Sequence, residues 1–209
     1  MAAAGINAQN YNMDMEIDND NDEQQNYMLT TNAARQFLPP FIEYNEFFNR
    51  SLVLGVDEQD ISVLYLHYLI IYGKWNDFMF HASHFLAQFQ EQDEREQFLN
   101  TTFNWFYKGG NLFFTCALWN APRDVLDFLH NEGGDISMEN TDGEFAEDVI
   151  TNPYYDYPFE YLGEDIANQG HVNDMGILCD HNDVTFTRDI NDFEDVRHYI
   201  AVLSGEEAP

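Results

Sequence analysis

The chain has 209 residues, of which 44% are hydrophobic, and its 18 Phe and 12 Tyr are sufficient for a substantial core. Its 38 acidic and 8 basic residues give a formal net charge of −30. This charge repels nucleic acid and anionic membranes, so a basic protein is the complementary partner. The composition therefore excludes a wholly disordered chain and a direct nucleic-acid binder.

The negative charge is unevenly distributed along the chain. Residues 135–209 contain nineteen acidic residues against Arg188 and Arg197, whereas residues 35–134 contain thirteen acidic and six basic residues. Two interpretations of this excess stay open: the charge keeps the protein in solution, or it recognises a basic protein surface.

Several features indicate the compartment. Cys116 and Cys179 are too few for a disulfide framework. The amino terminus lacks the basic and apolar regions of a secretion signal, and the longest apolar run, Val63 to Tyr72, is interrupted by His67 and too short for a membrane span. We therefore expect an intracellular protein, of the cytoplasm or the nucleus, with no membrane partner.

Residues 1–34 are rich in Asn, Asp and Gln and have little apolar periodicity, which predicts a disordered acidic tail. Within it, Asp18 to Asp22 resembles the start of a calcium loop. Such a loop needs Gly and Glu where the chain has Glu23 and Leu29, so we expect no calcium site. The apolar face of residues 41–54 then predicts a helix, which forms an amino-terminal cap over residues 35–57.

The next unit spans residues 58–107. Its first helix is predicted over Ile61–Tyr72, and its second begins near Trp75. The position of His67 in this unit corresponds to Thr115 in the following one, 48 residues later. That separation exceeds a 33-residue repeat by about fifteen residues, so the unit contains either a long second helix or an additional one.

The segment from Gly110 to Ser137 has a turn glycine, a short helix, a longer helix and a Gly133-Gly134 exit, and Gly143 follows Gly110 by 33 residues. This layout resembles an ankyrin repeat, with the best match over residues 108–150 and a looser one over 60–165. Three positions depart from the family pattern, where Phe113, Thr115 and Ala121 replace Pro, His and Gly.

The resemblance implies a mainly α fold: a short ankyrin-like helical solenoid with helical caps. Val125, Leu126, Phe128 and Leu129 are then core residues of the longer helix, and Gly133 ends it in a left-handed cap. The expected units are an atypical first repeat with an insertion (58–107), a second repeat (108–139), a third repeat (140–165), a carboxyl-terminal cap (166–203) with a helix over Phe193–Leu203, and a tail (204–209).

No motif of an enzyme or a cofactor site is found. His81 and His84 lie one helical turn apart, but no cysteine is near them and the neighbouring carboxylates are not specially spaced, so we expect no metal site. Cys179 and His181 could form part of a thiol-nucleophile site, but no residues near them in the sequence indicate an oxyanion hole or a third group that would orient the histidine. We therefore predict a protein that is not an enzyme.

In ankyrin proteins the hairpin tips and the exposed ends of the inner helices contact partners. The positions that match them here, and that we predict to bind a partner, are Trp119, Asn120, Glu139, Thr141, Asp142, Glu144 and Glu147; Lys108, Asn111 and Asn152 belong to the same face. Two interpretations of Trp119 stay open. Its ring is either an exposed anchor that offers a cation–π face to Arg or Lys, or it packs beneath the first repeat.

The leading hypothesis is a non-enzymatic protein–protein interaction module. Its acidic concave face binds a basic protein surface and thereby inhibits a DNA-binding or nuclear protein. Two alternatives remain: a DNA-mimic inhibitor of a nucleic-acid enzyme, and a structural subunit of a larger assembly.

Overall fold

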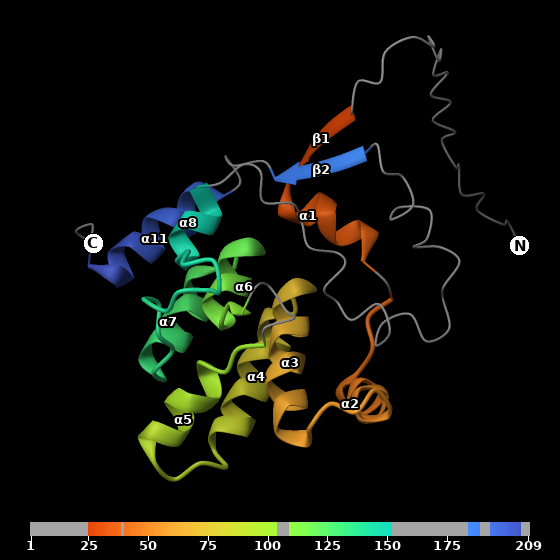
Figure 1. The fold of residues 1–209 in the computed structure, drawn as a ribbon, viewed down its shortest axis with the longest axis vertical. Helices are drawn as coiled ribbons and strands as arrows, with labels where there is room; N and C mark the ends of the chain where they lie inside the picture. Colours follow the sequence, from red (N-terminus) through yellow and green to blue (C-terminus); the bar gives the residue numbers. More distant parts are fainter. Residues whose placement is uncertain (1–24, 39, 104–108, 152–183, 189–192, 206–209) are drawn as a thin grey trace, which may run out of the picture.

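A computed structural model describes residues 25–38, 40–103, 109–151, 184–188 and 193–205 (Figure 1). The molecule is mainly helical, as predicted. The elements are β1 (Gln25–Leu29), α1 (Thr31–Ala34), the 3-10 helix η1 (Arg35–Phe37), α2 (Tyr44–Val53), α3 (Glu58–Ile71), α4 (Trp75–Leu86), α5 (Gln92–Leu99), α6 (Leu112–Leu118), α7 (Arg123–Asn131), α8 (Ala146–Thr151), β2 (Val184–Arg188) and α11 (Glu194–Ser204).

Two helical hairpins, α3–α4 and α6–α7, form the centre of the fold. The first helix of each hairpin ends in a left-handed residue, Gly73 (φ 65°) after α3 and Asn120 (φ 51°) after α6. The amide of the following residue then donates to a carbonyl of the last helical turn, from Lys74 to Leu69 and from Ala121 to Cys116, both at 2.9 Å. Asn120 therefore takes the left-handed position, and no glycine is needed at Ala121.

The hairpins pack side by side in two rows. Helix α6 contacts α3 and α8, so α3, α6 and α8 form one row; α7 contacts α4 and α11, which form the other. Helix α11 confirms the helix predicted over Phe193–Leu203, and it also contacts α8. The Tyr199 hydroxyl of α11 donates to Asp127 of α7, and Arg123 lies 4.2 Å from the centroid of the Tyr199 ring. The second row thus ends on a helix that comes from the far end of the chain.

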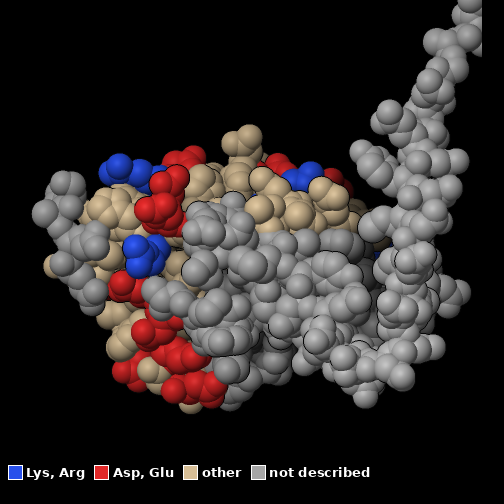
Figure 2. Space-filling view, turned by 90° about the horizontal axis from the view of Figure 1, so that it is seen from above, with Lys and Arg blue, Asp and Glu red and all other residues tan. Residues whose placement is uncertain are grey.

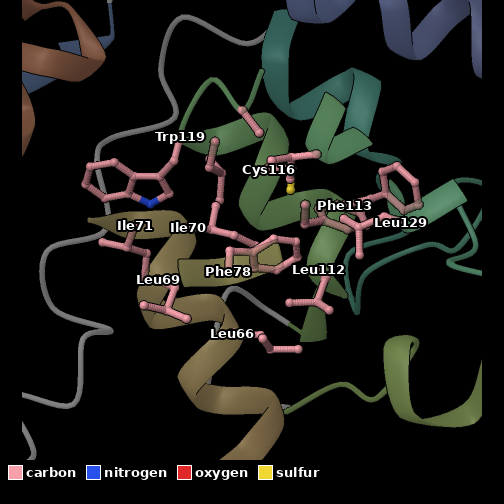
Figure 3. Packing of buried hydrophobic residues seen from close by; sticks show 14 of the residues in the cluster. Leu66, Leu69, Ile70, Ile71, Phe78, Leu112, Phe113, Cys116, Trp119 and Leu129 are labelled. Carbon is pink, nitrogen blue, oxygen red and sulfur yellow. The ribbon is translucent and has the colours of Figure 1, made fainter. Parts of the chain in front are cut away.

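A buried polar contact joins the two inner helices. The positions that correspond in the two hairpins meet directly, since His67 Nδ1 of α3 lies 2.6 Å from Thr115 Oγ1 of α6, and both residues are fully buried. Apolar side chains surround this pair. Figure 3 shows them packed between the hairpins: Leu66, Leu69, Ile70 and Ile71 of α3, Phe78 of α4, Leu112, Phe113 and Cys116 of α6, and Leu129 of α7.

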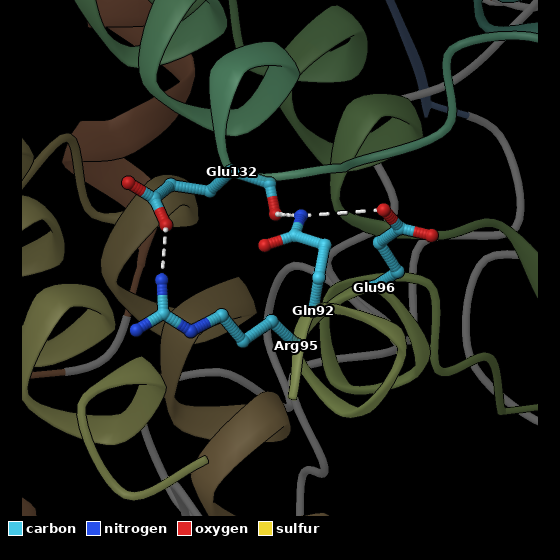
Figure 4. A network of polar contacts seen from close by, with 4 residues as sticks. All are labelled: Gln92, Arg95, Glu96 and Glu132. Atoms are coloured by element: carbon cyan, nitrogen blue, oxygen red, sulfur yellow. Dashed lines mark hydrogen bonds and ion pairs between the residues drawn. The ribbon is translucent and has the colours of Figure 1, made fainter. Parts of the chain in front are cut away.

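The extra residues of the first unit form a separate helix, α5, which resolves the two possibilities left open by the sequence. Polar contacts fix α5 to the carboxyl-terminal end of α7 (Figure 4). Gln92 Nε2 donates to the Glu132 carbonyl at 3.3 Å, and Arg95 pairs with the Glu132 carboxylate at 3.4 Å. Asn100 Nδ2 donates to the Gly133 carbonyl at 3.0 Å, so the loop after α7 is held as well.

The disordered tail predicted over residues 1–34 is wrong for its last ten residues. Strand β1 pairs in parallel with β2, from Gln25 opposite Val184 to Leu29 opposite Arg188, and α1 follows with the Thr30 hydroxyl as its amino-terminal cap. The partner strand lies far along the chain, so local periodicity does not reveal the pairing. Strand β2 overlaps the strand-like alternation of the sequence over residues 177–186, so the cap predicted over 166–203 contains a strand as well as the helix α11. The predicted segments 1–24, 152–165 and 166–183 lie outside the described residues.

The predicted left-handed cap at Gly133 is confirmed, with φ of 100° and the Gly134 amide 2.8 Å from the Leu129 carbonyl. A Cβ atom at Gly133 would lie 2.4 Å from Glu96 Cγ, whereas one at Gly55 (φ 81°) would meet nothing within 4 Å. We predict that Gly55→Ala lowers the free energy of unfolding by about 1 kcal/mol, from the backbone conformation alone. Gly133→Ala should cost more in urea unfolding, because Glu96 must move. Equal costs at the two positions would contradict the close contact between α5 and α7.

The buried histidine makes stability depend on pH. Burial lowers the pKa of His67 from 6.5 to about 3. Between pH 6.5 and about 3 the imidazole of His67 binds a proton in the unfolded chain but not in the folded chain. The free energy of unfolding therefore decreases as the pH falls below 6.5. We predict that the difference in free energy of unfolding between the natural chain and His67→Gln changes by about 2 kcal/mol from pH 7 to pH 5. Parallel pH curves in urea unfolding would contradict the burial of His67.

Candidate functional site

Trp119 is fully buried at the end of α6, with 0% exposure, so the interpretation as an exposed anchor is wrong. The alternative, in which the ring packs inside the fold, is confirmed. The expected cation–π contact nevertheless exists, because the chain's own Arg35 supplies it. The guanidinium carbon lies 5.7 Å from the centroid of the Trp119 ring and 5.1 Å from that of Trp75.

Arg35 also binds the carboxyl-terminal ends of α3 and α6. Its Nε donates to the Ile71 carbonyl at 2.9 Å, and Nη2 donates to the Trp119 carbonyl at 2.7 Å. Such carbonyls have no partner within their own helix and lie at the negative end of the helix dipole. This arrangement covers the Trp119 end of the predicted face with a segment of the chain itself.

Two other residues of the predicted face support the fold. Asn120 is half-buried and forms the left-handed turn between α6 and α7. Asn111 is 1% exposed, and its side chain accepts from the Phe113 amide at 3.0 Å and donates to the Asp135 carbonyl at 2.7 Å. Lys108 and Asn152 lie outside the described residues.

The remaining predicted residues come together in the loop before α8 and its first turn. We call residues 139–144 the acidic tip. The Asn140 side chain fixes this loop: its Oδ1 accepts from the amides of Asp142 and Glu144 at 2.9 and 3.0 Å, and its Nδ2 donates to the Glu144 carboxylate at 2.9 Å. Glu139, Thr141 and Asp142 are exposed, whereas Glu144 is half-buried, as is Glu147 in α8.

The acidic tip belongs to a strongly negative part of the surface. Residues 135–151 contain six acidic residues and no Lys or Arg. Figure 2 shows most of the Asp and Glu side chains in view at the end of the molecule that carries α11, with a few Lys or Arg side chains among them. Glu147 and Asp148 lie in the first turn of α8, where the helix dipole favours a negative charge. The acidic tip is therefore a loop held by side-chain hydrogen bonds within an acidic stretch of the chain.

A second surface, which the sequence did not predict, is a groove among α2, α3, α4 and α5. We call it the aromatic groove; its volume is about 960 Å³. Ring contacts build its floor: the Tyr44 centroid lies 5.6 Å from His81 and 5.5 Å from Phe85, and Phe85 lies 6.2 Å from Phe98. Further lining residues are Phe48, Glu58, Asp60, Phe80, His84, Phe89 and Glu94.

The aromatic groove is acidic as well as apolar. Three lining side chains are carboxylates, and among the residues that the structure describes, none of those lining the groove is Lys or Arg. Burial raises the pKa of Asp60, and the nearby Asp57 adds to this shift. Burial lowers the pKa of His81, against the opposing charge of Asp77, so His81 is mainly neutral at pH 7.

The groove was missed because its signal is the same as that of a core. Tyr44, Phe48 and Leu52 recur every four residues along α2, as do Phe80 and His84 along α4. Such spacing shows that one face of a helix is apolar. It does not show whether another helix covers that face or leaves it open, because coverage depends on where α5 docks.

Within residues 25–151, 184–188 and 193–205, apart from the gaps given above, no group of three or more His, Cys, Asp and Glu side chains is placed to hold a metal ion. In the same part of the chain no helix is long and apolar enough to cross a membrane. Cys179 and His181 lie outside the described residues. His81 and His84 both line the aromatic groove.

Comparison of the chain with protein-family models, with curated proteins and with solved structures gives no significant match. The proposed function therefore rests on the surfaces of this chain alone.

Proposed function

We propose that the chain is a non-enzymatic, ankyrin-like binding module whose acidic tip, together with Glu147, binds a Lys- and Arg-rich protein surface. Two features support the ankyrin-like arrangement. Consecutive helical hairpins lie side by side in two rows, and the corresponding residues His67 and Thr115 meet across the inner row. The left-handed cap at Gly133 lies where the repeat pattern requires it.

The observation that supports the proposed site most directly is the hydrogen bonding of the Asn140 side chain within the acidic tip. Asn140 fixes the backbone of the loop, and Glu139 and Asp142 point into solvent beside it. A preorganised loop loses little conformational entropy when it binds. The surrounding negative charge raises the rate of encounter with a positive surface and rejects negative ones.

The kind of partner follows from this chemistry. Basic surfaces of the required kind occur on the nucleic-acid-binding faces of proteins, which are rich in Lys and Arg. Binding there would compete with nucleic acid, so we propose that the module acts inside the cell as an inhibitor of a DNA-binding or nuclear protein.

Charge reversal tests the acidic tip. We predict that Glu139→Lys/Asp142→Lys weakens binding of a labelled Arg-Ser repeat peptide by about ten-fold at low salt, and by less at high salt because ions screen the charges. Fluorescence anisotropy over a salt series measures this. Glu144 is left unchanged because its carboxylate accepts a hydrogen bond from Asn140.

The matched control is Glu91→Lys/Asp93→Lys, which alters the net charge equally at exposed positions that belong to neither the acidic tip nor the lining of the aromatic groove. It should weaken binding of this peptide far less. If the two variants weaken binding equally, only the overall charge acts, and the acidic tip is not the site.

A further inference from the structure

The aromatic groove is an interaction surface distinct from the acidic tip, since helices α2 to α5 form it and α8 does not. A volume of about 960 Å³ is that of a sizeable ligand site. Its aromatic side chains lie in a connected set, so the floor is built by packing within the fold and exists without a partner. One aromatic ring of the groove is open to water: Phe80 is 69% exposed. The centroid of its ring lies 5.3 Å from that of His81.

We propose that the aromatic groove binds a protein segment that presents one bulky apolar side chain flanked by Lys or Arg. The apolar side chain lies on the floor formed by Tyr44, His81 and Phe85, where its burial removes apolar surface of both partners from water. The flanking cations lie against Glu58, Asp60 and Glu94, which line the same groove. A guanidinium also stacks favourably on an exposed ring such as Phe80.

Charge complementarity selects this occupant over the others. Nucleic acid and anionic lipid are repelled by the three carboxylates of the groove. Residues 1–24 of the chain contain six acidic residues and no Lys or Arg, so they do not suit it either. A second copy of the chain brings a formal charge of −30. A positively charged segment with an apolar side chain can contact both the carboxylates and the aromatic floor of the groove.

The apolar surface continues beyond the groove along α2. Tyr44 and Phe48 line the groove, and Leu52, one turn further on the same face, is 39% exposed. The segment that binds therefore extends past the end of the groove, towards Leu52. This inference does not rest on the acidic tip, and its test separates the two surfaces.

The experiment uses the full chain and three short labelled peptides. In the first, Lys residues flank a single Phe; in the second, Ser replaces this Phe; in the third, Glu replaces Lys. We expect the first peptide to bind at least about ten-fold more tightly than either of the others, because both the apolar and the charged contacts are needed.

Variants locate the site. Phe80→Ser/Glu94→Lys should weaken binding of the first peptide by about ten-fold, and both residues are exposed, so thermal unfolding should show an intact fold. The acidic-tip variant Glu139→Lys/Asp142→Lys should have little effect on it. Equal binding of the first two peptides, or equal weakening by both variants, would overturn the proposal. So would concentration-dependent self-association in sedimentation that Phe80→Ser abolishes, because the occupant would then be a second copy.

Discussion

The contact on which the rest of the structure depends is that of Arg35 with the ends of two inner helices. Its guanidinium donates to the carbonyls of Ile71 and Trp119, and so joins α3 to α6 where neither helix can satisfy its own last carbonyls. It also fixes the amino-terminal segment against the hairpins. Gly73 fits this arrangement, because a Cβ atom there would lie 3.0 Å from the Arg35 guanidinium carbon. The two polar links, Arg35 at the helix ends and His67 with Thr115 between the helices, set how α3 and α6 lie against each other.

This contact also decides which surfaces remain for a partner. The cation–π site that Trp119 offers is occupied from within the chain, where the effective concentration of Arg35 exceeds that of a partner in solution. Recognition is therefore left to the acidic tip before α8 and to the aromatic groove among α2 to α5. The two surfaces differ in chemistry, since the tip offers charge on a hydrogen-bonded loop and the groove offers apolar area edged by carboxylates.

Features fixed by neighbouring residues were predictable from the sequence. The cap at Gly133, the core face of α7 and the helix α11 follow from local spacing and backbone preference. Features that join distant segments were not: β1 pairs with a strand far along the chain, and Arg35 is a single cation in a polar stretch. The site divides in the same way. The acidic loop was predicted from its place in the ankyrin-like pattern and from the local excess of acidic residues, whereas the burial of Trp119 and the open face of Phe80 depend on tertiary packing.

The most direct test of this account is the solvent accessibility of Trp119. In a chain carrying Trp75→Phe and Trp105→Phe, Trp119 is the single tryptophan, and acrylamide quenching of its fluorescence, excited where tyrosine does not absorb, measures its exposure. We expect the quenching rate constant of Trp119 to be small with Arg35 present and to increase several-fold with Arg35→Ala. The segment around residue 35 covers Trp119, and this substitution removes its hydrogen bonds to the Ile71 and Trp119 carbonyls. Arg50→Ala, which removes a surface pair with Glu46, should leave quenching unchanged. Rapid quenching of Trp119 with Arg35 present would contradict the account.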